Sequence, residues 1–166
     1  MSTKLSENFT LEEMLVSSTA KKYGIKNVPD ATVKANMTLL CQKFLQPMRE
    51  AYGKPIIVTS GYRCPELNTK IGGSKTSQHM KGQAADINDG IGYKHGIEAR
   101  YEANAKLFNF IYKRGGYDQL INEFPDAKGR PQWIHVSYNP TLKKQRGQAL
   151  VAKKVNGKTV YLPYKR

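Results

Sequence analysis

Apolar side chains recur at helical spacing in two long stretches of the chain. In residues 33–48 the apolar positions follow one another by four, three or one, so that one face of a helix is apolar. Pro47 near the end of this stretch is expected to kink the helix or to mark its last turns. Residues 98–114 show the same spacing, and the two consecutive glycines that follow are typical of a helix end. A shorter helix is predicted after Thr10, because Thr10 and Glu13 form a capping-box pattern.

Short stretches rich in β-branched and aromatic residues predict the strands. They lie at residues 55–60, 84–88, 117–124, 133–138, 150–155 and 159–162. A polar turn separates the third stretch from the fourth, which favours an antiparallel hairpin. The pair Asn156 and Gly157 separates the last two stretches and is the strongest short hairpin signal in the sequence. Together these elements predict an α+β fold, with an antiparallel sheet packed against N-terminal and central helices.

The chain has the length of one domain. Its 166 residues are 39% hydrophobic and 24% charged, which supplies enough apolar material for a core and argues against disorder. We expect a main domain in residues 1–140 and a basic C-terminal β-hairpin extension of the same domain in residues 141–166. The longest apolar run is far shorter than the ~20 residues that cross a bilayer, so no membrane span is expected. The first residues lack an apolar signal core, so we expect synthesis in the cytoplasm without a signal peptide.

The net charge of the chain is strongly positive. Lys and Arg number 27 against 13 Asp and Glu, which gives +14. Such a balance favours a polyanionic partner, for which nucleic acid, anionic lipid and bacterial wall polymer all qualify. The sequence has no basic recognition helix and no RNA-binding motif with interleaved aromatic residues, so nucleic acid is the disfavoured partner.

Two histidines and one aspartate form the strongest chemical signal. His79 lies in a polar loop, Asp86 follows seven residues later on a predicted strand, and His135 lies on another strand. Two imidazoles and one carboxylate suit a catalytic zinc ion, which takes three protein ligands and leaves the fourth position for water. The alternative is three separate hydrogen-bonded polar residues. His95 has no carboxylate at ligand spacing and is expected in a surface loop.

The two cysteines of the chain indicate no disulfide framework, by number or by spacing. Cys41 falls on the apolar helix face and is expected in the core. Cys64 follows Arg63 in a loop, where a role as a nucleophile would need a neighbouring histidine.

The segment around the first histidine resembles a known zinc signature. The pattern Ser-x-His-x-x-Gly-x-Ala-x-Asp is filled by Ser77, His79, Gly82, Ala84 and Asp86. It is similar to the signature of the D-alanyl-D-alanine carboxypeptidase family of zinc metallopeptidases. That family includes phage endolysins and tail-associated wall peptidases, and it shares its fold with the hedgehog signalling domain.

Two further segments, residues 59–63 and 133–138, resemble the branch of this family that is common in phages. The three motifs occur in the family's order, and the resemblance covers most of the chain. It implies a hedgehog/DD-peptidase-like fold and one Zn²⁺ ion, with His79, Asp86 and His135 as the ligands.

The resemblance also bears on the catalytic residues. It makes Arg63 the candidate for holding the substrate's carboxylate or the developing oxyanion. Several branches place an acidic general base three residues before the last ligand, but here that position is Gln132, which cannot take a proton. Ser77 and Gln119 are candidates for hydrogen bonds to the substrate, with simple capping of the loop as the alternative for Ser77.

We expect Glu123 to act as the general base. If the hairpin pairs Ile121 with His135, Glu123 lies opposite Trp133 on the face that carries the metal ligand. A shift of one residue would send Glu123 to the other face, and a solvated glutamate at the strand end is the alternative. Asp118 is the reserve candidate, although strand alternation places it on the opposite face.

These expectations favour a zinc peptidase that hydrolyses amide bonds in the peptide stems of peptidoglycan, as a D,D-carboxypeptidase or an endopeptidase. The basic surface would concentrate such a protein on an anionic cell wall. We expect a monomer that serves in phage-derived wall lysis, after release or as part of a phage particle. The alternative, motivated by Gln132, is a catalytically inactive wall-binding or virion structural module with the same fold.

Overall fold

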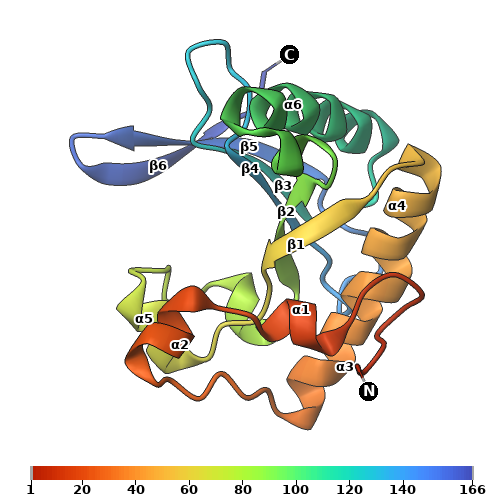
Figure 1. Ribbon diagram of the computed structural model, residues 1–166, viewed down its shortest axis with the longest axis vertical. Coiled ribbons are helices and arrows are strands. Elements are labelled where there is room, and N and C mark those ends of the chain that lie inside the picture. Colours follow the sequence, from red (N-terminus) through yellow and green to blue (C-terminus); the bar gives the residue numbers. More distant parts are fainter. Residues whose placement is uncertain (1, 166) are drawn as a thin grey trace.

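The computed structural model describes residues 2–165 and centres on a six-stranded sheet (Figure 1). The strands are β1 (Ile56–Ser60), β2 (Ala84–Asp89), β3 (Gln119–Glu123), β4 (Trp133–Ser137), β5 (Gln148–Val155) and β6 (Lys158–Pro163). Across the sheet they follow the order β1-β2-β4-β3-β5-β6. Neighbouring strands are antiparallel except β3 and β5, which are parallel. The predicted α+β class is therefore confirmed.

The sequence predicts an antiparallel sheet, and one pair of strands departs from it, because β3 and β5 are parallel. Strand β4 runs antiparallel to β3, and residues 138–147 then carry the chain to the far side of β3. Strand β5 therefore runs opposite to β4 and alongside β3, with Gln119 beside Gln148 and Glu123 beside Ala152.

The helices are α1 (Leu11–Leu15), α2 (Ser18–Tyr23), α3 (Ala31–Leu40), η1 (Cys41–Leu45), α4 (Gln46–Tyr52), α5 (Pro65–Lys70), η2 (Gln78–Lys81), η3 (Gly92–His95) and α6 (Ile97–Arg114). In Figure 1, α6 lies above the strands and α4 lies beside them, while α1, α2, α3 and α5 lie below β1. The apolar pattern does not indicate α2 and α5, since six residues span fewer than two helical turns. Within residues 2–165, no helix has the length and apolar content needed to cross a bilayer.

The first long helix passes Pro47 without ending there. Segment η1 is a π-helical turn in which the backbone N–H of Gln46 donates to the carbonyl of Cys41, five residues back. Proline has no N–H, and its ring clashes with the carbonyl four residues earlier in a regular α-helix. The wider π turn absorbs this conflict, so that α3, η1 and α4 continue one another as far as Tyr52.

The two faces of the sheet differ in what they contact. Alternate strand positions point into the apolar core, which the helices α3, α4 and α6 complete. The core positions of the central strands are Ala85, Ile87, Leu120, Ile134 and Val136. The positions between them point to the opposite face, and all the chemistry-bearing strand residues lie there.

The last hairpin forms at the predicted turn. Asn156 and Gly157 have φ angles of 50° and 75°, the left-handed values that a two-residue turn between antiparallel strands requires. Because β5 pairs with β3, this hairpin extends the main sheet. It therefore brings the basic C-terminal segment next to the strand that carries Glu123.

Candidate metal centre

Three separate elements supply the predicted ligands. His79 lies on η2, in the loop before β2, while Asp86 and His135 are direct neighbours across β2 and β4. All three side chains are buried, and they form a group whose ligand atoms could hold one metal ion. The convergence expected from the sequence is therefore present.

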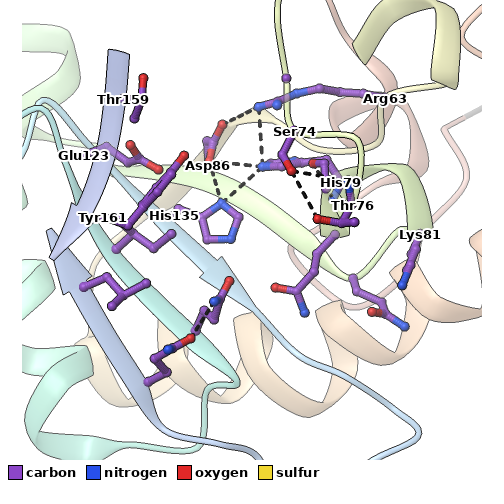
Figure 2. Close-up of a pocket in the computed structure, with 18 of the residues that line it drawn as sticks. Arg63, Ser74, Thr76, His79, Lys81, Asp86, Glu123, His135, Thr159 and Tyr161 are labelled. Atoms are coloured by element: carbon purple, nitrogen blue, oxygen red, sulfur yellow. Dashed lines mark hydrogen bonds and ion pairs between the residues drawn. The ribbon is translucent and has the colours of Figure 1, made fainter. Parts of the chain in front are cut away.

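The three ligand atoms form a nearly equilateral triangle (Figure 2). Nε2 of His79 lies 3.2 Å from Nδ1 of His135 and 3.3 Å from Oδ1 of Asp86. The third side, from Nδ1 of His135 to Oδ1 of Asp86, measures 3.2 Å. Atoms bound ~2.0 Å from a tetrahedral zinc ion lie about 3.3 Å apart. The donor set and its spacing thus fit one zinc ion with an open fourth position.

A backbone carbonyl fixes the orientation of His79. Its Nδ1–H donates to the carbonyl oxygen of Gly61 at 2.7 Å, so that Nε2 presents its lone pair to the centre. Gly61 is held in turn against α1, where a Cβ on this residue would lie 2.5 Å from the carbonyl oxygen of Met14. The Gly61 that opens the Gly-Tyr-Arg segment therefore has a direct role in placing a ligand.

The other histidine is prepared for binding by burial. Desolvation lowers the pKa of His135, which keeps its imidazole neutral, the form that binds metals. Its Nδ1 faces the centre, whereas its buried Nε2 has no hydrogen-bond partner among residues 2–165.

Arg63 gives the two oxygens of Asp86 different roles. Its guanidinium donates to Oδ2 of Asp86 at 2.7 Å and to Oγ of Ser60 at 3.1 Å, which leaves Oδ1 for the centre. Burial alone would raise the pKa of Asp86, but the two histidines outweigh it and hold that pKa well below its usual range. The carboxylate is therefore ionised, as a metal ligand must be.

Glu123 lies where the predicted register puts it. Ile121 pairs with His135 and Glu123 pairs with Trp133, so Glu123 shares the face of the ligands. Its side chain is buried, with 7% of the residue exposed, so the alternative of a solvated strand end is wrong. Burial and the negative charge of Asp86 raise the pKa of Glu123 from 4.5 to about 8. Such a carboxyl can take and release a proton near neutral pH.

Asp118, the reserve candidate, belongs to a different network. Its buried carboxylate accepts two hydrogen bonds from Arg146 at 2.7 Å and one from Gln78 at 2.8 Å. The hydrogen bonds from Arg146 are the main reason that the pKa of Asp118 is lowered. Asp118 therefore links the loop before His79 to the start of β5. Its carboxylate is already paired and is not available as a general base.

The two residues expected to contact substrate both line the cleft over the centre. The Oγ of Ser77 accepts from the backbone N–H of His79 at 3.3 Å, so Ser77 does cap the turn that carries the ligand. The side chain of Gln119 donates to Oε1 of Gln148 at 2.6 Å.

The cleft has a volume of about 1100 Å³ and has walls from two distant parts of the chain. The loop before β2 forms one wall, and the β5–β6 hairpin forms the other. The hairpin residues that line it are Gln148, Leu150, Lys154, Lys158, Thr159 and Tyr161. Sequence reasoning missed this wall, because it depends on the parallel pairing of β5 with β3, which no local pattern signals.

The remaining histidine and the cysteines lie elsewhere. His95 ends η3, is exposed, and hydrogen-bonds to the carbonyl of Ile91 at 2.7 Å, as expected of a surface residue. Cys41 is in the core, as predicted. Cys64 is buried at the start of α5, where its backbone N–H donates to Oδ1 of Asn27.

Two histidines and an aspartate form a buried centre, which opens to a cleft beside an acidic residue. This arrangement is typical of metal-dependent hydrolases. Within that class the chain belongs to the peptidase M15 family, whose family model matches residues 7–114. The matched segment includes His79 and Asp86 and ends before Glu123 and His135.

A curated relative points to the same family. The chain is 40% identical over 84 residues to a protein named zinc D-Ala-D-Ala carboxypeptidase from Streptomyces albus G. The match covers 50% of this chain and 32% of that protein, so the chain spans about a third of the length of the relative. The resemblance to the zinc D-alanyl-D-alanine carboxypeptidase family is confirmed.

Proposed function

We propose that this protein is a zinc peptidase that hydrolyses amide bonds in the peptide stems of peptidoglycan, as a D,D-carboxypeptidase or an endopeptidase. Membership of the M15 family and the name of the Streptomyces relative support the reaction and the substrate class. The observation that carries the proposal is the triangle of His79, Asp86 and His135 atoms with Glu123 in the same cleft. This arrangement supplies both a metal site and a separate acid–base group.

The metal and Glu123 divide the chemistry. A zinc ion in a three-ligand site polarises a carbonyl and makes water a stronger nucleophile at neutral pH. Glu123 removes a proton as the oxygen of water attacks the amide carbon, and it later delivers that proton to the departing amine nitrogen. One proton moves from water to the amine, so Glu123 ends the cycle in the protonation state in which it began.

Arg63, Ser77 and Gln119 position the substrate. The guanidinium of Arg63 orients Asp86 and lines the cleft, where its charge stabilises the negative charge that develops on the carbonyl oxygen. Ser77 and Gln119 line the cleft as well and offer hydrogen bonds to the peptide backbone.

The setting we propose is phage-derived wall lysis, after release or on a phage particle. The net charge of +14 supports a role at an anionic wall surface, since opposite charge concentrates an enzyme on its polymer. This charge acts at long range and is independent of the chemistry in the cleft.

Mass spectrometry of a defined muropeptide tests the proposal. The zinc-loaded protein is expected to release a D-alanine or to cut within the stem, and a chelator is expected to stop the release. The fragment masses identify the bond. Intact muropeptide after incubation with zinc-loaded protein would contradict the proposal.

One observation favours a second candidate function, an inactive wall-binding or virion module. Gln132 occupies the position where several branches of the family carry an acidic base, and its backbone N–H donates to the carbonyl of Glu123. Stoichiometric zinc and retention on purified wall without release of amines, unchanged in Glu123→Ala, would establish this alternative.

A further inference from the structure

One row of residues crosses the sheet from the metal-bearing strand to the last hairpin. Trp133 on β4 pairs with Glu123 on β3, Glu123 with Ala152 on β5, and Ala152 with Tyr161 on β6. Directly paired residues point to the same face of a sheet. Tyr161 therefore shares the cleft face with Glu123.

The residue between them is small. Ala152 is fully buried and carries only a methyl group, so the ring of Tyr161 can lean across it toward Glu123. In Figure 2, Tyr161 and Glu123 lie on one side of Asp86, and Arg63 lies on the other. The cleft thus has a phenol and a guanidinium on opposite sides of the ligand group.

The hydroxyl of Tyr161 is free to meet a ligand. Figure 2 shows no hydrogen bond from Tyr161 to the residues drawn around it, and 53% of Tyr161 is exposed even though its ring lines the cleft. Burial, together with the negative charges of Glu123 and Asp86, raises the pKa of Tyr161. The phenol therefore stays protonated at neutral pH and remains a hydrogen-bond donor.

We propose that Tyr161 is a further catalytic residue, whose phenolic O–H donates a hydrogen bond to the substrate at the reacting carbonyl from the wall opposite Arg63. This inference rests on the proposed peptidase function. A donor aimed at the oxygen where charge develops lowers the barrier more than it tightens ground-state binding. Tyr161 lies outside the residues 7–114 matched by the family model, so the proposal concerns the hairpin of this chain.

The first test compares Tyr161→Phe with the wild type on a soluble stem peptide that ends in D-Ala-D-Ala. The variant keeps the ring and removes only the hydroxyl. We expect kcat to fall about 10- to 100-fold while KM changes less than about threefold, because the lost contact acts mainly in the transition state. Zinc content and melting temperature should match the wild type.

Tyr164→Phe is the matched control. Tyr164 follows β6 but packs against Phe108 and Tyr112 of α6, so its loss should leave kcat unchanged. Unchanged kcat in Tyr161→Phe, or an equal loss in both variants, would overturn the proposal.

The second test measures binding without turnover. A phosphinic analogue of the dipeptide, with a tetrahedral phosphorus in place of the scissile carbonyl, is titrated into zinc-loaded protein. Trp133 is the only tryptophan and lines the cleft, so its fluorescence reports occupancy. Tyr161→Phe is expected to lower the affinity for the analogue about tenfold and to leave the affinity for the product peptide unchanged.

The two measurements separate the two proposals. If the wild type cleaves nothing but binds the analogue more tightly than Tyr161→Phe does, the peptidase function is wrong, and the hydrogen bond from Tyr161 to the ligand is supported. If the wild type cleaves the peptide and Tyr161→Phe alters neither kcat nor analogue affinity, the function stands and the contact is wrong. A wild type that neither cleaves the peptide nor binds the analogue contradicts both.

Discussion

The carbonyl oxygen of Gly61 accepts a 2.7 Å hydrogen bond from Nδ1 of His79, and so links the end of β1 to a residue of the candidate metal centre 18 residues away. This contact selects the tautomer of His79 that leaves Nε2 free. Gly61 can supply it only because it lies against the backbone of Met14, where a side chain does not fit.

Gly61→Ala should therefore weaken zinc binding. The added Cβ meets the carbonyl oxygen of Met14 at 2.5 Å, so the backbone must shift and the hydrogen bond to His79 lengthens. We expect zinc affinity to fall about 10- to 100-fold, as for the loss of other groups that orient a ligand, measured by competition with a chromophoric chelator. Gly24→Ala is the control, because the φ of 65° at Gly24 would strain an alanine although the space around it is open. An equal loss of affinity in both variants would contradict the argument.

Replacing any ligand should remove the metal. His79→Ala, Asp86→Ala and His135→Ala each leave two protein ligands, so zinc occupancy after dialysis and hydrolysis of wall should both be lost. His95→Ala is the matched control, since His95 is exposed on η3, and should keep both. Elemental analysis and a wall-turbidity assay provide the readouts. Full zinc occupancy in any of the three ligand variants would exclude that residue.

Glu123→Gln should separate metal binding from turnover. The amide fills the same space but cannot take a proton, so we expect full zinc occupancy and a loss of kcat of about 100-fold or more. Glu66→Gln changes an exposed glutamate on α5 and should leave both unchanged. Wild-type kcat in Glu123→Gln would remove the assignment of Glu123 as the base.

The same residue should make the metal-free protein less stable at higher pH. The pKa of Glu123 is raised by burial from 4.5 to about 8, so the folded chain binds a proton that the unfolded chain releases. The contribution of Glu123 to the free energy of unfolding is therefore highest below pH 4.5 and falls, by several kcal/mol, as the pH rises to about 8. Urea denaturation of the metal-free protein at pH 5 and pH 8.5 measures the fall. Glu123→Gln should show a smaller fall than the wild type, and identical falls would be inconsistent with this origin.

Arg146→Gln should destabilise the fold through Asp118. The substitution removes two hydrogen bonds from a carboxylate that is fully buried, and an unpaired buried acceptor costs about 1–3 kcal/mol. Arg146 lowers the pKa of Asp118, so its contribution is present above the ordinary pKa of 3.8 and fades as the pH falls below that value. The free energy of unfolding of the variant should differ from that of the wild type by a large amount at pH 7 and by a small amount at pH 3. Lys143→Gln, nearby in the chain, serves as the control.

The sequence predicts the parts of the site that local patterns determine. His79 and Asp86 lie in one short motif, and strand alternation places Glu123 on the face of His135 once Ile121 is assumed to pair with His135, a register that the structure has. The long helices follow from apolar periodicity, although the π turn before Pro47 does not, because it depends on how the chain resolves a clash.

The parts that sequence reasoning missed depend on contacts between distant segments. The parallel pairing of β5 with β3 is set after a ten-residue connection, and the position of Tyr161 opposite Arg63 depends on it. Asp118 looks like a reserve acid in the sequence, and only the fold reveals that Arg146 and Gln78 already hold it.

The order of the strands also has a consequence for synthesis on the ribosome. The three residues that could hold a metal ion are all present once β4 has been made, but one wall of the cleft, with Tyr161, comes from β5 and β6, which emerge later. A nascent chain that has folded as far as β4 could thus capture a metal ion before it can hold a substrate between two walls. The order of the strands thus separates the residues that could hold a metal ion from those that complete the cleft.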